Sequence, residues 1–238
     1  MARKKAGGIA ETVRTIVYAA LIALVVRTFL FEPFNIPSGS MLPTLLIGDY
    51  LFVSKYSYGY SKHSFPFSPE LFEGRVMEGQ PERGDVVVFK LPSDNSTDYI
   101  KRVIGLPGDR ILVQDGILHI NGAAVARQKI EGEDPEAPGG TIYLETLPNG
   151  VTHRIRETSD DEFGDHTREY IVPPEHYFVM GDNRDNSQDS RFIGPIPAEN
   201  LVGRAEILFF SVDGSAALWE VWRWPTAIRW WRLFNPVE

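Results

Sequence analysis

The 238-residue chain contains no cysteine, which excludes disulfide bonds, cysteine nucleophiles and thiolate metal sites. It also has no excess of positive charge. Its formal net charge is −8, whereas general nucleic-acid-binding proteins present basic surfaces to phosphates. The sequence holds no His-Glu-x-x-His, P-loop, Gly-x-Gly-x-x-Gly or Gly-x-Ser-x-Gly motif. We therefore expect no metal, no cofactor and no nucleic-acid partner.

One long apolar run is present, at residues 13–31. A helix over this run would be about 28 Å long, close to the roughly 30 Å of a bilayer's hydrocarbon layer. A cleaved signal peptide or a buried amphipathic helix are the alternatives, but no Ala-x-Ala-like site follows the run. We predict an uncleaved single-pass anchor in the plasma (inner) membrane, ended by Glu32-Pro33. The basic cluster at residues 3–5 places residues 1–12 in the cytoplasm and the remainder on the extracytoplasmic (periplasmic) side.

The remainder of the chain favours a mainly β fold. β-branched and aromatic residues predict strands, and no alternation of strands with helices is visible. The predicted strands lie at residues 49–56, 85–91, 99–104, 110–113, 117–120, 176–180 and 201–212. Residues 123–170 are more polar and acidic, with short alternating stretches. We predict a β core from residues 32–122 and 171–215, with an inserted smaller β domain at 123–170.

The tail, residues 216–238, contains all five tryptophans, interleaved with arginines. Tryptophan and arginine together favour the membrane–water interface, so we predict a membrane-interface tail. The alternative is a segment that packs against the core.

Ser40 lies in a turn shortly after the predicted anchor, preceded by Gly39 and flanked by Pro37 and Pro43. A serine is a weak nucleophile and needs a base. The five histidines lie in no recognisable triad element, and we interpret them as surface or hydrogen-bonding residues. Lys101 could act as a base if burial made it neutral. The strand pattern alone does not choose between Lys101 and Arg102, but a guanidinium cannot usefully lose its proton.

Four stretches together resemble the successive signature motifs of bacterial type I signal peptidases, also called leader peptidases. They occur in order at residues 38–45, 83–89, 99–109 and 181–191. The resemblance implies a serine–lysine dyad protease on a mostly β fold, with Ser40 as nucleophile and Lys101 as general base. Other residues acquire roles by the same resemblance. Ser187 would orient the lysine amine, Ser38 and the Ser40 N–H would form the oxyanion hole, and Asp189 and Arg191 would form a supporting ion pair.

The resemblance also implies the substrate: signal peptides of exported preproteins, cut after small residues at an Ala-x-Ala type of site. We expect the substrate to add as a strand to a sheet edge, for which residues 85–91 are the candidate. The other partner would be membrane lipid. The sequence shows no coiled-coil pattern, and we expect a monomer. Two other classes stay open. One is a membrane-tethered binding or scaffolding protein with a structural Ser40 turn; the other is a related Ser/Lys protease that cleaves a regulatory protein or itself, which the anchor disfavours.

Overall fold

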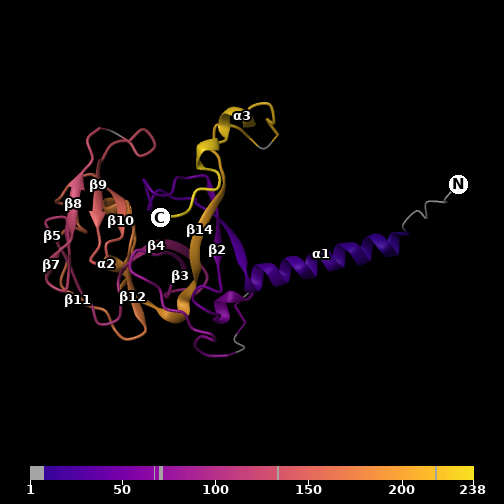
Figure 1. The fold of residues 1–238 in the computed structure, drawn as a ribbon, viewed down its shortest axis with the longest axis horizontal. Helices are drawn as coiled ribbons and strands as arrows, with labels where there is room; N and C mark the ends of the chain where they lie inside the picture. Colours follow the sequence, from indigo (N-terminus) through magenta and orange to yellow (C-terminus); the bar gives the residue numbers. More distant parts are fainter. Residues whose placement is uncertain (1–7, 67, 70–71, 133, 218) are drawn as a thin grey trace.

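One long helix, α1 (Ile9–Phe29), projects from a β-rich body (Figure 1). The computed structural model describes residues 8–66, 68–69, 72–132, 134–217 and 219–238. The helix is long and apolar enough to cross a membrane, and every residue in it except Thr28 is exposed. It ends before Glu32-Pro33, and Pro33 lies instead in the strand that follows, β1 (Phe31–Asn35). Proline is tolerated there because β1 is an edge strand.

The central sheet has seven strands in the order β1-β2-β14-β3-β4-β12-β13, and the paired strands run antiparallel. The strands after β1 are β2 (Asp49–Ser54), β14 (Leu201–Ser211), β3 (Val86–Lys90), β4 (Asp98–Gly105), β12 (His176–Met180) and β13 (Ile196–Pro197). Val86 and Val88 of β3 pack into one apolar cluster, while Val87 and Phe89 pack into another. The sheet is therefore covered on both faces at its centre.

The expectation that residues 85–91 form a sheet edge is wrong. Strand β3 lies between β14 and β4, which bind both of its backbone edges. An apolar run that alternates into two cores is typical of an inner strand, because only an inner strand is buried on both faces.

Two smaller sheets lie on the side of the body away from α1 (Figure 1). One has the order β11-β5-β6-β7, formed by β5 (Arg110–Gln114), β6 (Ile117–Ile120), β7 (Ala123–Ala124) and β11 (Tyr170–Ile171). The other has the order β10-β9-β8, formed by β8 (Ala126–Lys129), β9 (Thr141–Thr146) and β10 (Thr152–Glu157). The domain boundary predicted at residue 122 thus runs through the four-stranded sheet, whose apolar side packs on Ile104 and Phe178 of the central sheet. The mainly β fold with one N-terminal apolar helix is confirmed.

The tail both packs on the body and exposes its tryptophans. Arg232 donates to both carboxylate oxygens of the buried Asp49, and Val237 packs against the central apolar cluster. Trp219 and Trp222, in contrast, are 77% and 72% exposed. In Figure 1, helix α3 (Trp224–Ala227) lies at the top of the body, on the half nearer α1. The remaining short helices are η1 (Lys62–Ser64), η2 (Arg184–Asn186), α2 (Ser190–Ile193), η3 (Ala198–Asn200) and η4 (Trp230–Arg232).

Candidate active site

The structure brings Ser40 and Lys101 together, although they are far apart in the sequence. Lys101 Nζ donates a hydrogen bond to Ser40 Oγ at 2.8 Å and another to the Ile100 carbonyl oxygen at 2.8 Å. Lys101 is only 3% exposed. Burial lowers the pKa of the Lys101 ammonium to about 8, against the opposing effects of Asp189 and Asp182. A large fraction of this lysine is therefore neutral near pH 8, as a general base must be.

Arg102, the alternative that the strand pattern left open, lies on the opposite face of β4. It is fully buried, and its guanidinium binds the Asp182 carboxylate through Nε at 2.9 Å and Nη2 at 2.7 Å. A third donor, Nη1, binds the Gly84 carbonyl oxygen at 2.8 Å. Side chains alternate along a strand, so β4 directs the lysine to the serine and the arginine to the interior.

The turn that carries Ser40 is held by the segment that follows β12. The Asn183 side chain donates to the Gly39 carbonyl oxygen at 2.8 Å, and its backbone N–H donates to the Ser40 carbonyl oxygen at 3.1 Å. Thr44 donates to Asp182 at 2.6 Å, and Met41 is fully buried in the central core. Ser40 is thus fixed from both sides of its turn.

Gly181 allows the Ser187 loop to approach this turn closely. A Cβ atom at Gly181 would collide with the Ser187 side chain and the Ser40 carbonyl oxygen. Ser187 is 7% exposed and lines the same cavity as Ser40 and Lys101. The expected hydrogen bond from Lys101 to Ser187 is not formed; the lysine donates to Ser40 and to the Ile100 carbonyl oxygen. Among the described residues Ser187 Oγ has no partner that meets hydrogen-bond geometry, but it lies close enough to the Asp189 carboxylate to help lower the pKa of that group.

Asp189 and Arg191 form a buried ion pair behind the Ser187 loop, with Nη2 and Oδ2 2.9 Å apart. Asp189 also accepts from the backbone N–H of Gly181 at 3.0 Å and of Arg191 at 3.2 Å. Although burial opposes it, the Arg191 guanidinium holds the pKa of the Asp189 carboxyl below its usual value. The pair therefore stays charged and ties the loop to the end of β12.

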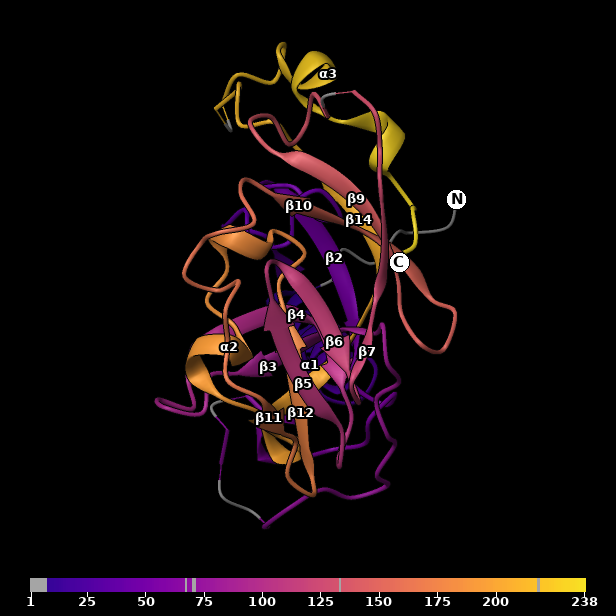
Figure 2. The ribbon, with the colours of Figure 1, turned by 90° about the vertical axis from the view of Figure 1, so that its left-hand side faces the viewer.

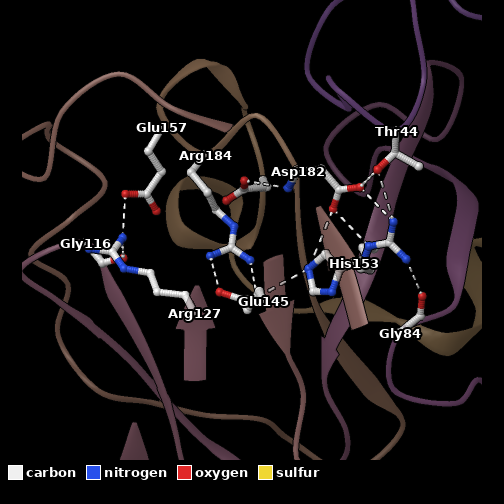
Figure 3. A network of polar contacts seen from close by, with 12 residues as sticks. Thr44, Gly84, Gly116, Arg127, Glu145, His153, Glu157, Asp182 and Arg184 are labelled. Carbon is white, nitrogen blue, oxygen red and sulfur yellow. Dashed lines mark hydrogen bonds and ion pairs between the residues drawn. The ribbon is translucent and has the colours of Figure 1, made fainter. Parts of the chain in front are cut away.

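A further buried ion pair, absent from our sequence interpretation, joins Glu145 and Arg184 (Figure 3). Glu145 of β9 accepts from both terminal nitrogens of Arg184, one of them at 2.9 Å. His153 of β10 lies between Glu145 and Asp182, with Nε2 3.3 Å and 4.0 Å from their nearest oxygens. His153 is buried and is therefore not a surface residue; its Nε2 faces the Glu145 carboxylate, and its Nδ1 has no hydrogen-bond partner among the described residues. In β10, His153 and Ile155 are buried, whereas Thr152 and Arg154 between and beside them are exposed. This alternation along the strand is the sequence signal that could have revealed the burial of His153.

An open groove with a volume of about 520 Å³ leads to Ser40. One wall is formed by residues 34–40 and the other by residues 97–101, with residues 185–188 and Phe192 beyond the serine. Strand β1 has one unpaired edge, because it is the outermost strand of its sheet. The first half of β4 pairs with β3 alone, since its pairing with β12 begins only at Arg102. The groove therefore offers backbone groups on both sides to an extended peptide.

A groove for an extended chain that contains a serine beside a buried lysine is the arrangement of a serine peptidase. The family model described as "Signal peptidase, peptidase S26" matches residues 9–210. Signal peptidase I of Rickettsia typhi is 43% identical over 231 residues, which cover 90% of this chain and 80% of that protein. Signal peptidase I of Rickettsia canadensis is 42% identical over 93% of this chain and 82% of that protein. The chain belongs to the signal peptidase family, peptidase S26, and is a serine peptidase.

A solved structure of a signal peptidase I from Enterococcus faecalis is 25% identical to this chain. The match covers 52% of this chain and 96% of the other, with a TM-score of 0.33.

Proposed function

We propose that this protein removes signal peptides from exported preproteins, with Ser40 as nucleophile and Lys101 as general base. The observation that carries the proposal is the 2.8 Å hydrogen bond between Lys101 Nζ and Ser40 Oγ, made by a lysine that is almost fully buried. Family membership and the names of the most similar relatives support the choice of substrate.

In the first half of the reaction, the neutral Lys101 amine takes the Ser40 proton as Oγ attacks the scissile carbonyl carbon. The resulting ammonium gives a proton to the departing amine, the C–N bond breaks, and an ester of Ser40 with the signal peptide remains. In the second half, Lys101 takes a proton from water as the water oxygen attacks the ester carbon. The bond between that carbon and Ser40 Oγ breaks, Lys101 returns the proton to Oγ, and the signal peptide leaves as a carboxylic acid. Each half returns the lysine to its neutral form.

The oxyanion of each tetrahedral intermediate needs donors within the groove. We assign these to the Ser38 hydroxyl and the Ser40 backbone N–H, because Ser38 is exposed on the wall that leads to the nucleophile. Loss of one such donor typically lowers the rate roughly 10²- to 10³-fold. Ser187 would orient the lysine amine after a small side-chain rotation, and the ion pair of Asp189 and Arg191 would support its loop.

An extended substrate would add as a strand between residues 34–38 and 97–101, with its small side chains directed into the groove. This geometry supports cleavage after an Ala-x-Ala type of site, because alternate side chains of an extended peptide point to the same wall.

We further propose that α1 anchors the protein with its N-terminus in the cytoplasm and the body on the extracytoplasmic side. Strand β1 begins two residues after α1 ends, so the groove starts close to the membrane surface. The exposed Trp219 and Trp222, which shortly precede α3, would contact the membrane interface. The arrangement suits a monomer that meets its substrate while the signal helix is still in lipid.

The test is cleavage of a preprotein with an Ala-x-Ala site by the detergent-solubilised wild type, Ser40→Ala and Lys101→Ala. We expect cleavage at that site by the wild type alone, with all three proteins folded. Equal cleavage by all three would move the active site elsewhere. No cleavage by the wild type, even with lipid restored, would favour a membrane-tethered binding protein.

A further inference from the structure

A second cavity, of about 370 Å³, adjoins the catalytic groove at Phe192. Phe192, in α2, lines both spaces, so the groove and this cavity meet at one aromatic residue. The cavity is bounded by residues 161–164 and 166–168, Tyr170, Arg191 and Phe192. The loop that forms most of it belongs to the polar segment between β10 and β11, to which the catalytic proposal gives no role.

Two aromatic rings stand at the rim of this cavity. Phe163 is 87% exposed, and its ring stacks on that of Phe192 with centroids 5.9 Å apart and an interplanar angle of 17°. The rings present an apolar surface to solvent among charged neighbours such as Asp161 and Arg168. Exposed rings in a fixed stacked arrangement are a typical contact surface for an apolar or aromatic side chain.

The loop that carries Phe163 is packed against the catalytic support. A Cβ atom at Gly164 would lie 2.7 Å from Arg191 Nη1, so the glycine allows the loop to touch the guanidinium of the Asp189–Arg191 pair. Beneath it, the Tyr170 hydroxyl donates to the Arg191 carbonyl oxygen at 2.8 Å. The cavity is therefore held in a fixed relation to the Ser187 loop and to the groove.

The position of the membrane sets the direction in which a substrate would cross the groove. The wall formed by residues 34–38 follows directly from α1, whereas α2 lies on the side of the body away from α1 (Figure 1; Figure 2). A signal helix still in lipid brings the part of the substrate before the cut along the first wall. The part after the cut then leaves Ser40 toward residues 185–188, Phe192 and the second cavity.

We propose that the cavity lined by Phe163 and Phe192 is a subsite for the mature part of the preprotein. It takes the first few residues after the cut in extended form and binds an apolar or aromatic side chain against the two rings. This inference rests on the proposed function, since the same substrate occupies both spaces. The side chain in this subsite contributes to substrate affinity and not to the chemical step.

The test uses peptides that share one Ala-x-Ala signal side and differ only after the cut. One peptide carries four glycines there, and four others carry a single phenylalanine at each of these positions in turn. For the full-length wild type in detergent, we expect phenylalanine at one position to lower KM about three- to tenfold with little change in kcat. Phe163→Ala should abolish this preference, and Phe163→Trp should keep it.

The matched control is Met77→Ala, which also truncates an exposed apolar side chain, 80% exposed, on a loop outside both cavities. It should keep the wild-type preference. The inference is overturned if the wild type has no preference at any position, or if Phe163→Ala retains it. It is also overturned if Phe163→Ala lowers binding to lipid vesicles and leaves the preference intact, because the rings then contact membrane. Cleavage of the four-glycine peptide by the wild type and not by Ser40→Ala separates these outcomes from a failure of the proposed function.

Discussion

Asn183 holds the residue before Ser40: its side-chain Nδ2 donates to the carbonyl oxygen of Gly39 at 2.8 Å. The Asn183 Oδ1 atom in turn accepts from Arg156 of β10 at 3.0 Å. An amide of fixed orientation thus links the smaller three-stranded sheet to the turn of Ser40. The polar segment between β7 and β11 therefore contributes to the position of the nucleophile through this contact.

We expect Asn183→Ala to lower kcat about tenfold to a hundredfold with little change in KM, because a small displacement of the nucleophile slows attack more than binding. Steady-state cleavage of an Ala-x-Ala peptide measures both constants. Asn149→Ala is the matched control, since Asn149 Nδ2 also donates to a backbone carbonyl, that of Arg83, at 2.7 Å. Equal losses of kcat in the two variants would contradict a specific effect on Ser40 and would show a general effect on the stability of the protein.

The pH dependence of cleavage should report the protonation of Lys101. Only the neutral amine can accept the Ser40 proton, and burial lowers the pKa of Lys101 to about 8. Single-turnover rates should therefore rise about tenfold per pH unit below that value and level off above it. A rate that is flat from pH 6 to pH 9 would contradict a lysine base. Lys101→Arg should be as inactive as Lys101→Ala, because a guanidinium stays protonated throughout this range.

Lys101→Met should be inactive and yet more stable than the wild type at neutral pH. The lysine pKa is about 8 in the folded protein and 10.5 in the unfolded chain, so the unfolded chain binds the proton more tightly. Below pH 8 the buried ammonium lowers the free energy of unfolding by its full amount, at most about 3 kcal/mol. This cost shrinks as the pH rises from 8 and disappears above 10.5. Chemical unfolding at pH 7 and pH 10 measures the effect. The advantage of the variant should shrink at the higher pH, and an advantage independent of pH would contradict the prediction.

Asp182→Asn should destabilise the protein by about 3–5 kcal/mol, because it leaves the buried Arg102 guanidinium without its charged partner. Denaturant unfolding measures the loss. The control is Glu169→Gln, which breaks the ion pair with Arg110. The Glu169 side chain is 39% exposed and the Arg110 side chain is 60% exposed. An exposed pair contributes about 0–1 kcal/mol, so this variant should be close to the wild type. Similar losses in both variants would show that burial does not set the strength of the Arg102–Asp182 pair.

Strands with strong β propensity were predictable, because their signal is contained in a few adjacent residues. Strands β2, β4, β5, β6, β12 and β14 lie within a residue or two of the predicted ranges. The order of these strands in the sheet was not predictable in the same way. Residues 85–91 were expected at an edge but lie at the centre, because pairing with β14 joins segments more than a hundred residues apart.

By itself, the sequence determined the apolar N-terminal helix, the mainly β character and the order of the motifs that contain Ser40, Lys101 and Ser187. Each of these depends on local periodicity or on residues close together in the chain. The strand pattern left open which of Lys101 and Arg102 faces the serine, and the tertiary structure places Lys101 there. The tertiary structure also decided that His153 and Glu145 are buried behind Asp182, and that the end of the tail packs on Asp49. These outcomes depend on which strands become neighbours and which faces meet, and that is set by the packing of the whole sheet.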